Sequence, residues 1–382
     1  MTLQRHFVLA AGGTGGHMVP AAALAAELAR RGHRVALVSD ARGVRFPGLF
    51  EGVQTHVLPA GRFQIKRPQG WAAAAREMWR GRAMARELYR TFKPSAVIGF
   101  GGYPAFPALS AAFAAGVPTA IHEQNAVLGR VNRLVAGRVD AIATSYAKTE
   151  RLSPKLASKA LHVGNPVREA VLALRARPYP LLEEDGIFRV LVTGGSQGAS
   201  VLSQVVPDGL SMLPVAFRRR LQVTHQARIE DIDAARAKYA ELDIAADLAT
   251  YIDDMPGELA WAHLVIARAG ASTIAELTAA GRPAILVPLP GATDDHQTAN
   301  AREITSVGGA RTIAQERFTP VELAKQVQKL GLEPAALENA AGRARAIGKP
   351  DAARDLADLV ESLDAPVARL PVVQAARKEA FA

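Results

Sequence analysis

The chain has 382 residues, which exceeds the size that one hydrophobic core usually serves, so two domains are expected. Its 49% hydrophobic and 21% charged residues are typical of a globular protein and exclude an intrinsically disordered chain. The lack of cysteine excludes disulfides, zinc–thiolate sites and cysteine nucleophiles, and the net charge of +10 favours an anionic partner: nucleic acid, a phospholipid surface or a phosphorylated substrate.

Short apolar runs alternate with alanine-rich amphipathic segments in the first half of the chain. After the first run, "AALAAELARRG" has the pattern of a helix, and Gly32 provides its stop signal. This alternation predicts βαβ units and a parallel sheet. The expected strands cover residues 7–11, 34–40, 95–100, 118–124, 140–145 and 160–165.

The same pattern restarts at residue 188, where "FRVLVTGGSQGASVLSQVV" again predicts a strand, a glycine-rich turn and a helix. Further strands are expected at 220–226, 248–253, 263–270 and 283–290. We therefore predict an α/β protein with two Rossmann-like domains, residues 1–168 and 169–350, facing a cleft. A helix at 351–367 would complete the first domain, and residues 368–382 would form a tail.

Each half opens with a glycine-rich loop, "GGTGGH" at 12–17 and "GGSQG" at 194–198. The first loop lacks the lysine of a P-loop, and Met18 stands where a dinucleotide fingerprint needs its third glycine. Asp40 could still imitate the ribose-binding acid of a dehydrogenase. Glycine could also serve only the sterics of a tight turn, but two such loops at matching points favour paired phosphate sites.

Polar groups follow several other strands, where α/β proteins place ligand-binding residues. They occur in "IHEQN" (121–125), "GNPVR" (164–168), "ARAGASTIAEL" (267–277) and "PGATDDHQTANA" (290–301). Thr273 and Glu276 have the spacing of a helix capping box, which is the structural alternative to ligand binding there.

"GGTGGH", "GGYPAFPAL", "HEQNAVLGRVNRL", "GNPVR", "GGSQGA", "YIDDM", "RAGASTIAEL" and "DDHQTANA" occur in the order found in one family. Over about residues 5–365 the chain resembles the MurG family of bacterial N-acetylglucosaminyltransferases, in glycosyltransferase family 28, which convert lipid I to lipid II in peptidoglycan synthesis. The resemblance implies the GT-B fold, with a last helix that crosses back to the amino-terminal domain. It also implies action at the cytoplasmic face of the bacterial inner membrane, with other cell-wall enzymes as possible partners.

By the same resemblance, the carboxy-terminal domain binds the donor UDP-GlcNAc and the amino-terminal domain takes the acceptor lipid I. "HMVPAA", "GGYPAFPA" and Ala269, where serine is frequent, depart from common family variants without removing an assigned polar group. The implied donor residues are Arg168 and Ser196 for UDP, Ile252 for uracil, Ala271, Ser272 and Thr273 for the diphosphate, Glu276 for the ribose, Gln297 for the sugar, and Thr14, Gly15, Gly16 and Asn125 from the other domain.

The family reaction inverts the anomeric carbon, so it needs a base for the acceptor hydroxyl and stabilisation of departing UDP. His17 is the leading candidate base, because imidazole titrates near neutrality, although it could instead only position substrate. Glu123 is the rival. Helix dipoles and Arg168 would stabilise the leaving group. We expect no metal or cofactor, because the "DD" pairs at 253–254 and 294–295 are not the DxD motif.

Residues 62–90 contain eight Lys or Arg and two Glu, interleaved with aromatic and methionine side chains. This segment is either a core-packing helix with solvated basic residues or a patch that docks on an anionic membrane surface. No RNA-recognition motif supports nucleic-acid binding. We also expect no signal peptide and no spanning segment, since no apolar run reaches about 18 residues. The predicted patch consists of Trp71, Met78, Trp79, Arg80 and Arg82.

Three other functions share parts of this pattern. A UDP-GlcNAc 2-epimerase and a glycolipid glycosyltransferase are the enzymatic alternatives on the same fold. A non-catalytic nucleotide-sugar sensor is the alternative outside enzymes. An epimerase would need acid–base carboxylates in the cleft and no lipid-facing patch.

Overall fold

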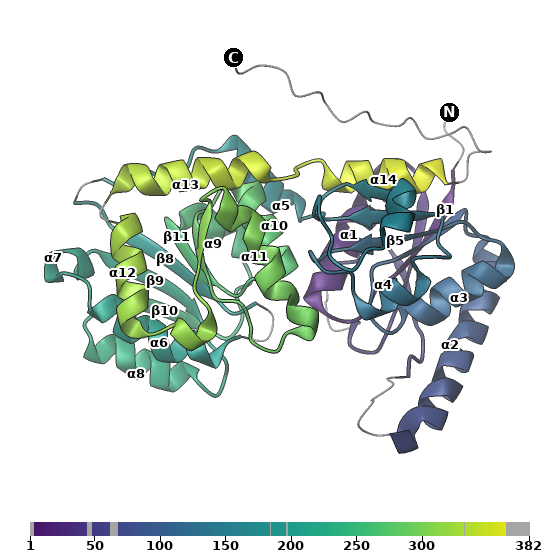
Figure 1. Cartoon of the computed structure of the whole chain (residues 1–382), viewed down its shortest axis with the longest axis horizontal. Helices are drawn as coiled ribbons and strands as arrows, with labels where there is room; N and C mark the ends of the chain where they lie inside the picture. The colour runs from purple at the N-terminus through teal and green to yellow at the C-terminus, as the bar shows by residue number, and fades with distance from the viewer. Residues whose placement is uncertain are drawn as a thin grey trace, which may run out of the picture.

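The computed structural model describes residues 4–43, 48–61, 68–183, 185–195, 198–331 and 333–363. Its amino-terminal half is a seven-stranded parallel sheet with the order β3-β2-β1-β4-β5-β6-β7, and helices cover both faces (Figure 1). The strands are β1 (His6–Ala10), β2 (Arg34–Ser39), β3 (Gln54–Val57), β4 (Ala96–Gly99), β5 (Thr119–Glu123), β6 (Ala141–Thr144) and β7 (Ala160–His162). The helices are α1 (Gly15–Arg30), α2 (Trp71–Phe92), α3 (Ala105–Ala115) and α4 (Arg130–Val135).

The carboxy-terminal half repeats this plan with six parallel strands in the order β10-β9-β8-β11-β12-β13. The strands are β8 (Phe188–Thr193), β9 (Leu221–Gln226), β10 (Ala245–Ala249), β11 (Leu264–Ala267), β12 (Ala284–Leu286) and β13 (Ala310–Thr312). The helices are α5 (Glu169–Leu172), α6 (Ser200–Ser211), α7 (Val215–Arg218), α8 (Ile232–Glu241), α9 (Met255–Trp261), α10 (Ala271–Ala280), α11 (His296–Ser306), α12 (Pro320–Gly331) and α13 (Pro334–Ile347), followed by α14 (Ala352–Ser362).

The strand order reverses beside the first strand of each half. The chain runs from β1 outward to β3 and returns to β4 on the other side of β1, and β8 and β11 stand in the same relation. In doubly wound sheets, ligands bind at the carboxyl ends of the strands at such a reversal. The two predicted glycine-rich loops follow β1 and β8, so they lie at these two points. The predicted α/β architecture with two parallel sheets is therefore confirmed.

The edges of the sheets differ from the sequence prediction. β3 and β13 were not predicted. β3 is largely exposed and lacks a buried apolar run, and β13 has only three residues, of which Ala310 alone is buried. The strand expected at 248–253 is wrong in position: β10 ends at Ala249, and Tyr251 beyond it is 61% exposed. Edge strands pack on fewer neighbours, so apolar patterning marks them poorly.

The first sheet is buried on both faces because β1 alternates its side chains between two cores. Val8 packs with the core under α2 and α3, whereas Phe7 and Leu9 pack with the core under α1 and α14. Leu356 and Val360 from α14 belong to that second core, although they come from the far end of the described chain. The chain thus crosses from the carboxy-terminal half back to the first sheet, as Figure 1 shows.

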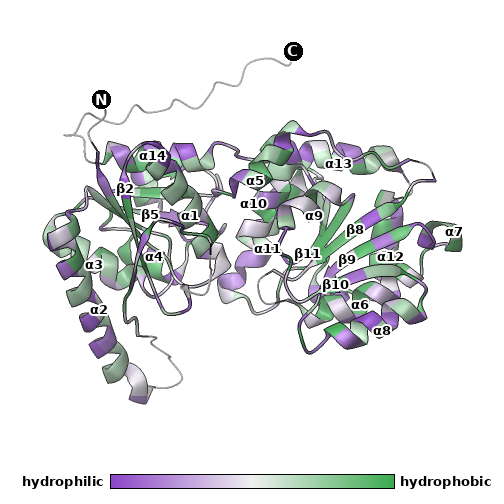
Figure 2. Cartoon of the chain, turned by 180° about the vertical axis from the view of Figure 1, so that it is seen from behind, coloured by the Kyte–Doolittle hydropathy of each residue, from purple (hydrophilic) through white to green (hydrophobic). Residues whose placement is uncertain are grey.

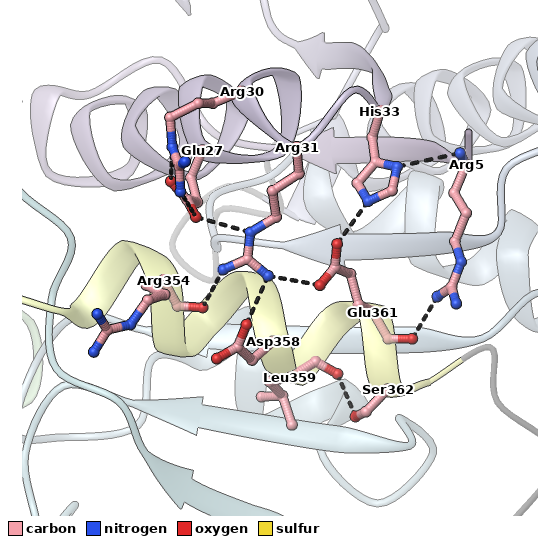
Figure 3. Close-up of polar contacts among 10 residues, drawn as sticks. All are labelled: Arg5, Glu27, Arg30, Arg31, His33, Arg354, Asp358, Leu359, Glu361 and Ser362. Carbon is pink, nitrogen blue, oxygen red and sulfur yellow. Dashed lines mark hydrogen bonds and ion pairs between the residues drawn. The ribbon is translucent and has the colours of Figure 1, made fainter. Parts of the chain in front are cut away.

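A charged cluster joins the end of α1 to α14 (Figure 3). The Arg31 guanidinium donates to Glu27 at 2.8 Å and to Asp358 and Glu361 at 2.6 Å each, and its side chain is only 18% exposed. The other carboxylate oxygen of Glu361 lies 2.6 Å from Nε2 of His33. This charged cluster positions α14 along α1 in a way that apolar contacts alone would not.

Replacing Arg31 with methionine should weaken the docking of α14. The substitution keeps an unbranched stem but removes the charge-assisted hydrogen bonds to three carboxylates, so we expect a loss of about 1–2 kcal/mol in unfolding free energy. Chemical denaturation followed by circular dichroism measures it. Arg30→Met is the matched control: Arg30 is 71% exposed and, within the described ranges, forms an ion pair with Glu27 alone, so its loss should leave the midpoint unchanged. Equal losses in the two variants would contradict the assignment.

Candidate functional site

The glycines of the first loop fall into two groups. A Cβ atom on Gly12 would lie 2.8 Å from the Cα of Gly102, and one on Gly13 would lie 2.4 Å from Asp40, so both positions require glycine. A Cβ on Gly15 or Gly16 would meet nothing within 4 Å. Sterics therefore explain the first pair, while the second pair leaves the start of α1 open to a ligand.

His17 stands just inside α1, against a second glycine-rich loop. Gly101 and Gly102, which follow β4, have φ values of +92° and +77°, and a Cβ on Gly101 would lie 3.2 Å from the imidazole. Nδ1 of His17 lies 3.0 Å from Oε1 of Gln124. Burial lowers the pKa of His17, although the Gln124 hydrogen bond and the charge of Glu123 oppose this effect. The ring is therefore neutral at neutral pH.

Glu123 ends β5 and is buried, with 2% of its surface exposed. One carboxylate oxygen accepts from the backbone and side-chain nitrogens of Asn125 at 3.0 and 3.2 Å. The other accepts from the Gly129 backbone at 2.7 Å and from Asn132 at 2.8 Å. A carboxylate has about four acceptor sites, so these four bonds occupy it and hold the loop between β5 and α4.

The two halves touch through Asn300 of α11, which is fully buried. Its side chain accepts from the Ala126 backbone at 2.7 Å and donates to Asn125 at 3.1 Å and to the Ala269 carbonyl at 3.3 Å. One amide thus links the loop after β5 to the loop after β11. Asn300 was not predicted as a site residue, and its only sequence signal was its place in a polar helix start.

Ion pairs reinforce this junction. Asp294, before α11, accepts from Arg133 at 2.7 Å and from Arg151 at 2.8 Å, both in the amino-terminal half. Arg302 of α11 pairs with Glu150. Since α1 also lies against α10, the start of α1 and the loop after β5 meet α10 and α11 at one interface.

On the carboxy-terminal side, α10 begins at Ala271 after Gly270, and no side chain of the described residues caps it. The capping box considered as the alternative to ligand binding for Thr273 and Glu276 is therefore wrong, because Thr273 lies inside the first turn rather than before it. Glu276 instead accepts from Arg168 at 2.8 Å. Burial raises the pKa of Glu276, and the Arg168 charge opposes this.

The residues predicted to bind the donor substrate differ in how far the protein itself uses their polar groups. The Ser272 hydroxyl and Nε of Arg168 are buried and make no hydrogen bond within the described part of the chain. Ile252 is 9% exposed, and Oε1 of Gln297 accepts from the Leu289 backbone at 2.9 Å. Thr14 precedes α1 without a side-chain cap. Ser196 lies outside the described residues.

Two acidic residues that the sequence analysis considered for ribose or metal binding, Asp40 and Asp254, make hydrogen bonds within their own turns. Asp40 accepts from the backbone of Arg42 and Gly43 and from the Arg42 guanidinium, so it holds its own turn. Asp254 accepts from the Gly257 backbone at the start of α9. In the ranges that the structure describes, no group of three or more His, Asp or Glu side chains could hold a metal ion.

The helix α2 extends from the amino-terminal half and has two unlike faces (Figures 1 and 2). Ala85 and Leu88 belong to its buried face, whereas Trp79 is 67% and Trp71 46% exposed. The Arg82 guanidinium lies 5.3 Å from the centre of the Trp79 ring. Met78 and Arg82 are half-buried and Arg80 is exposed, so α2 packs on the core and also carries basic and aromatic side chains on its exposed face. No helix among the described residues combines the length and apolarity needed to cross a membrane.

Known proteins resemble this chain along nearly its whole length. Residues 7–144 match the glycosyltransferase family 28 N-terminal domain, and residues 189–358 match the family 28 C-terminal domain. The "UDP-N-acetylglucosamine--N-acetylmuramyl-(pentapeptide) pyrophosphoryl-undecaprenol N-acetylglucosamine transferase" of Zymomonas mobilis is 62% identical over 361 residues, 94% of this chain and 93% of the relative. The protein of the same name from Novosphingobium aromaticivorans is 64% identical over 364 residues, 95% and 94% of the two chains.

A solved structure agrees with these sequence matches. MurG of Acinetobacter baumannii superposes with a TM-score of 0.75 at 30% identity, covering 94% of this chain and 99% of that one. The expected GT-B architecture and the resemblance drawn from the motifs are therefore confirmed. This chain belongs to glycosyltransferase family 28, among its N-acetylglucosamine transferases.

Proposed function

We propose that this protein transfers GlcNAc from UDP-GlcNAc to the 4-hydroxyl of MurNAc in lipid I, with inversion at the anomeric carbon, to give lipid II for peptidoglycan synthesis. The observation that carries the proposal is the 62–64% identity, over at least 94% of the chain, to transferases named for this donor and acceptor. The 2-epimerase and glycolipid glycosyltransferase alternatives are not favoured, because these relatives carry neither name.

We propose that the carboxy-terminal half, residues 169–350, binds the donor. The start of α10 would offer free backbone N–H groups and the Ser272 hydroxyl to the diphosphate, and Arg168 would add a positive charge. Glu276 and Gln297 would reach the ribose and the sugar. The amino-terminal half, residues 1–168 with the helix that includes α14, would take lipid I. Its loop residues Thr14, Gly15, Gly16 and Asn125 would close the donor site.

In this mechanism His17 is the general base. The acceptor oxygen attacks the anomeric carbon as its proton passes to Nε2 of His17, and the bond from that carbon to the phosphate oxygen breaks with its electron pair leaving on UDP. The start of α10 and Arg168 stabilise the charge that develops on UDP. The proton then passes from His17 to solvent, so the neutral base is restored.

The hydrogen bonds of Glu123 support His17 over the rival base. All four acceptor sites of this carboxylate are used within the loop after β5, so a proton from substrate would have to displace one of them. Among the described residues His17 has a hydrogen-bond partner only at Nδ1, and the residue is half-buried rather than fully enclosed. Glu123 would then shape the loop that presents Asn125.

The transfer assay with His17→Ala and Glu123→Gln tests these roles. Labelled UDP-GlcNAc and a lipid I analogue should yield UDP and labelled lipid II with the wild-type protein. We expect His17→Ala to lower kcat by about 100-fold or more and to keep its melting temperature. Glu123→Gln should mainly lower the melting temperature, because an amide cannot accept all four bonds. His56→Ala, on the edge strand β3, is the control. A near-normal rate for His17→Ala would falsify the assignment.

The pH dependence should follow His17. Burial lowers the pKa of His17 below its usual 6.5, the positive charges of Arg42 and His296 add to this, and Gln124 and Glu123 oppose it. A base works only when neutral, so kcat/KM should hold at neutral pH and fall on acidification with a midpoint below 6.5. Initial rates measured across the acidic range give this midpoint. A wild-type midpoint above the usual value contradicts the prediction.

We also propose that the α2 surface docks on anionic lipid at the cytoplasmic face of the inner membrane, where the lipid-linked acceptor would be reached. This surface consists of Trp71, Met78, Trp79, Arg80 and Arg82. Exposed tryptophan and arginine side chains on one helix suit the boundary between headgroups and acyl chains.

The combined variant Trp79→Ala, Arg80→Glu, Arg82→Glu should lose binding to vesicles that contain an anionic phospholipid, measured by co-sedimentation. The matched control is Ile229→Ala, Arg219→Glu, Arg236→Glu, which makes the same charge change and removes an exposed apolar side chain in the carboxy-terminal half. It should bind like the wild type. Unchanged binding of the α2 variant, or equal loss in the control, rejects the proposed surface.

A further inference from the structure

A chain of buried polar groups leads from the imidazole of His17 into the amino-terminal half. Nδ1 of His17 lies 3.0 Å from Oε1 of Gln124, and Nε2 of Gln124 lies 2.9 Å from Nδ1 of His122. Nε2 of His122 lies 2.9 Å from the carbonyl oxygen of Gly164, beyond β7. Gln124 is 1% exposed and His122 is fully buried. Neither residue is assigned a role in binding or catalysis above.

Backbone carbonyls determine the direction of every bond in this chain, because they can only accept. Nε2 of Gln124 also lies 2.9 Å from the carbonyl oxygen of His122 itself, so the NH2 group must point there and Oε1 must face His17. The Gly164 carbonyl likewise requires a hydrogen on Nε2 of His122. Burial lowers the pKa of His122 to about 4, so its ring is neutral and its Nδ1 accepts from Gln124.

The direction of the hydrogen bond between Gln124 and His17 follows from the orientation of the Gln124 amide. Since Oε1 of Gln124 only accepts, Nδ1 of the neutral His17 ring must carry the hydrogen. Nε2 of His17 then holds a lone pair, and it makes no hydrogen bond to any residue that the structure describes. This is the tautomer that a general base needs at Nε2, and the reversed amide would produce the opposite one.

We propose that Gln124, oriented by His122, is a positioning residue that fixes the base tautomer of His17. The proposal rests on the proposed function, in which Nε2 of His17 takes the proton of the acceptor hydroxyl. In that step Nδ1 keeps its hydrogen bond to Gln124 and no proton moves along the chain. A neutral amide in this place also differs from a carboxylate, which would hold the protonated imidazole more strongly and slow its return to the neutral base.

Nitrogen NMR of protein labelled with 15N-histidine tests the tautomer directly, without substrate. His17→Ala identifies the signals of His17, and at neutral pH we expect hydrogen on Nδ1 and a free Nε2. In Gln124→Met, which has similar length and no amide, this preference should be lost. Gln226→Met is the matched control: Gln226 is also a buried amide that ends a strand, yet its partners are Thr193 and Thr250. It should leave the His17 signals unchanged.

Kinetics test the consequence for catalysis. Gln124→Met should lower kcat by about five- to tenfold, because the lone pair then lies at Nε2 in only part of the molecules, while the Kd for UDP-GlcNAc should stay within about twofold. Hydrogen on Nε2 in the wild type, or a wild-type kcat in Gln124→Met, overturns the inference even if the protein transfers GlcNAc. A wild-type protein with the expected tautomer but no transfer would instead contradict the proposed function. If Gln124→Met does not fold, the wild-type spectrum alone still decides the tautomer.

Discussion

The close approach of two glycine-rich loops beside β1 and β4 is the contact on which the rest of the site depends. The Gly12 backbone donates to the Gly101 carbonyl at 3.0 Å, and the Cα atoms of Gly12 and Gly102 come so near that neither residue could carry a side chain. This contact lies where the strand order reverses, so it joins the ends of β1 and β4. It also leaves room for the imidazole of His17 against Gly101, within reach of Gln124. A Cβ atom on Gly101 would press on the ring, and one on Gly12 or Gly102 would force the two loops apart.

The two halves are held together by contacts of different kinds. Asn300 makes buried hydrogen bonds to both the loop after β5 and the loop after β11. Asp294 and its two arginine partners are more exposed and therefore more sensitive to salt. On the opposite side of β1 from α2 and α3, α14 returns to the first sheet and is placed by Arg31. The connections between the halves thus lie both beside the site and at the end of the described chain.

The sequence predicted most of the architecture, because both sheets are built from buried apolar strands that alternate with helices. It failed at the edges: β3 is largely exposed, β13 has only three residues, and β10 is displaced from the expected run. The same limit applies to side chains. The spacing of Thr273 and Glu276 fits a capping box equally well, but the start of α10 at Ala271 leaves Glu276 free to pair with Arg168. Spacing alone does not show where a helix begins.

The sequence by itself determined the family, the order of the elements and the residue types at the strand ends, since these follow from local patterns and motifs. Only the tertiary structure decided what those residues do for one another. "HEQN" places a histidine, a glutamate and a glutamine side by side, but the fold points Glu123 into its own loop and Gln124 toward His17. The direction of the Gln124 amide depends on the carbonyl of His122. The position of the hydrogen on the His122 ring depends in turn on the carbonyl of Gly164, which is 40 residues beyond Gln124 in the chain. Such long-range partners are invisible in a local pattern, because they meet only when the sheet forms.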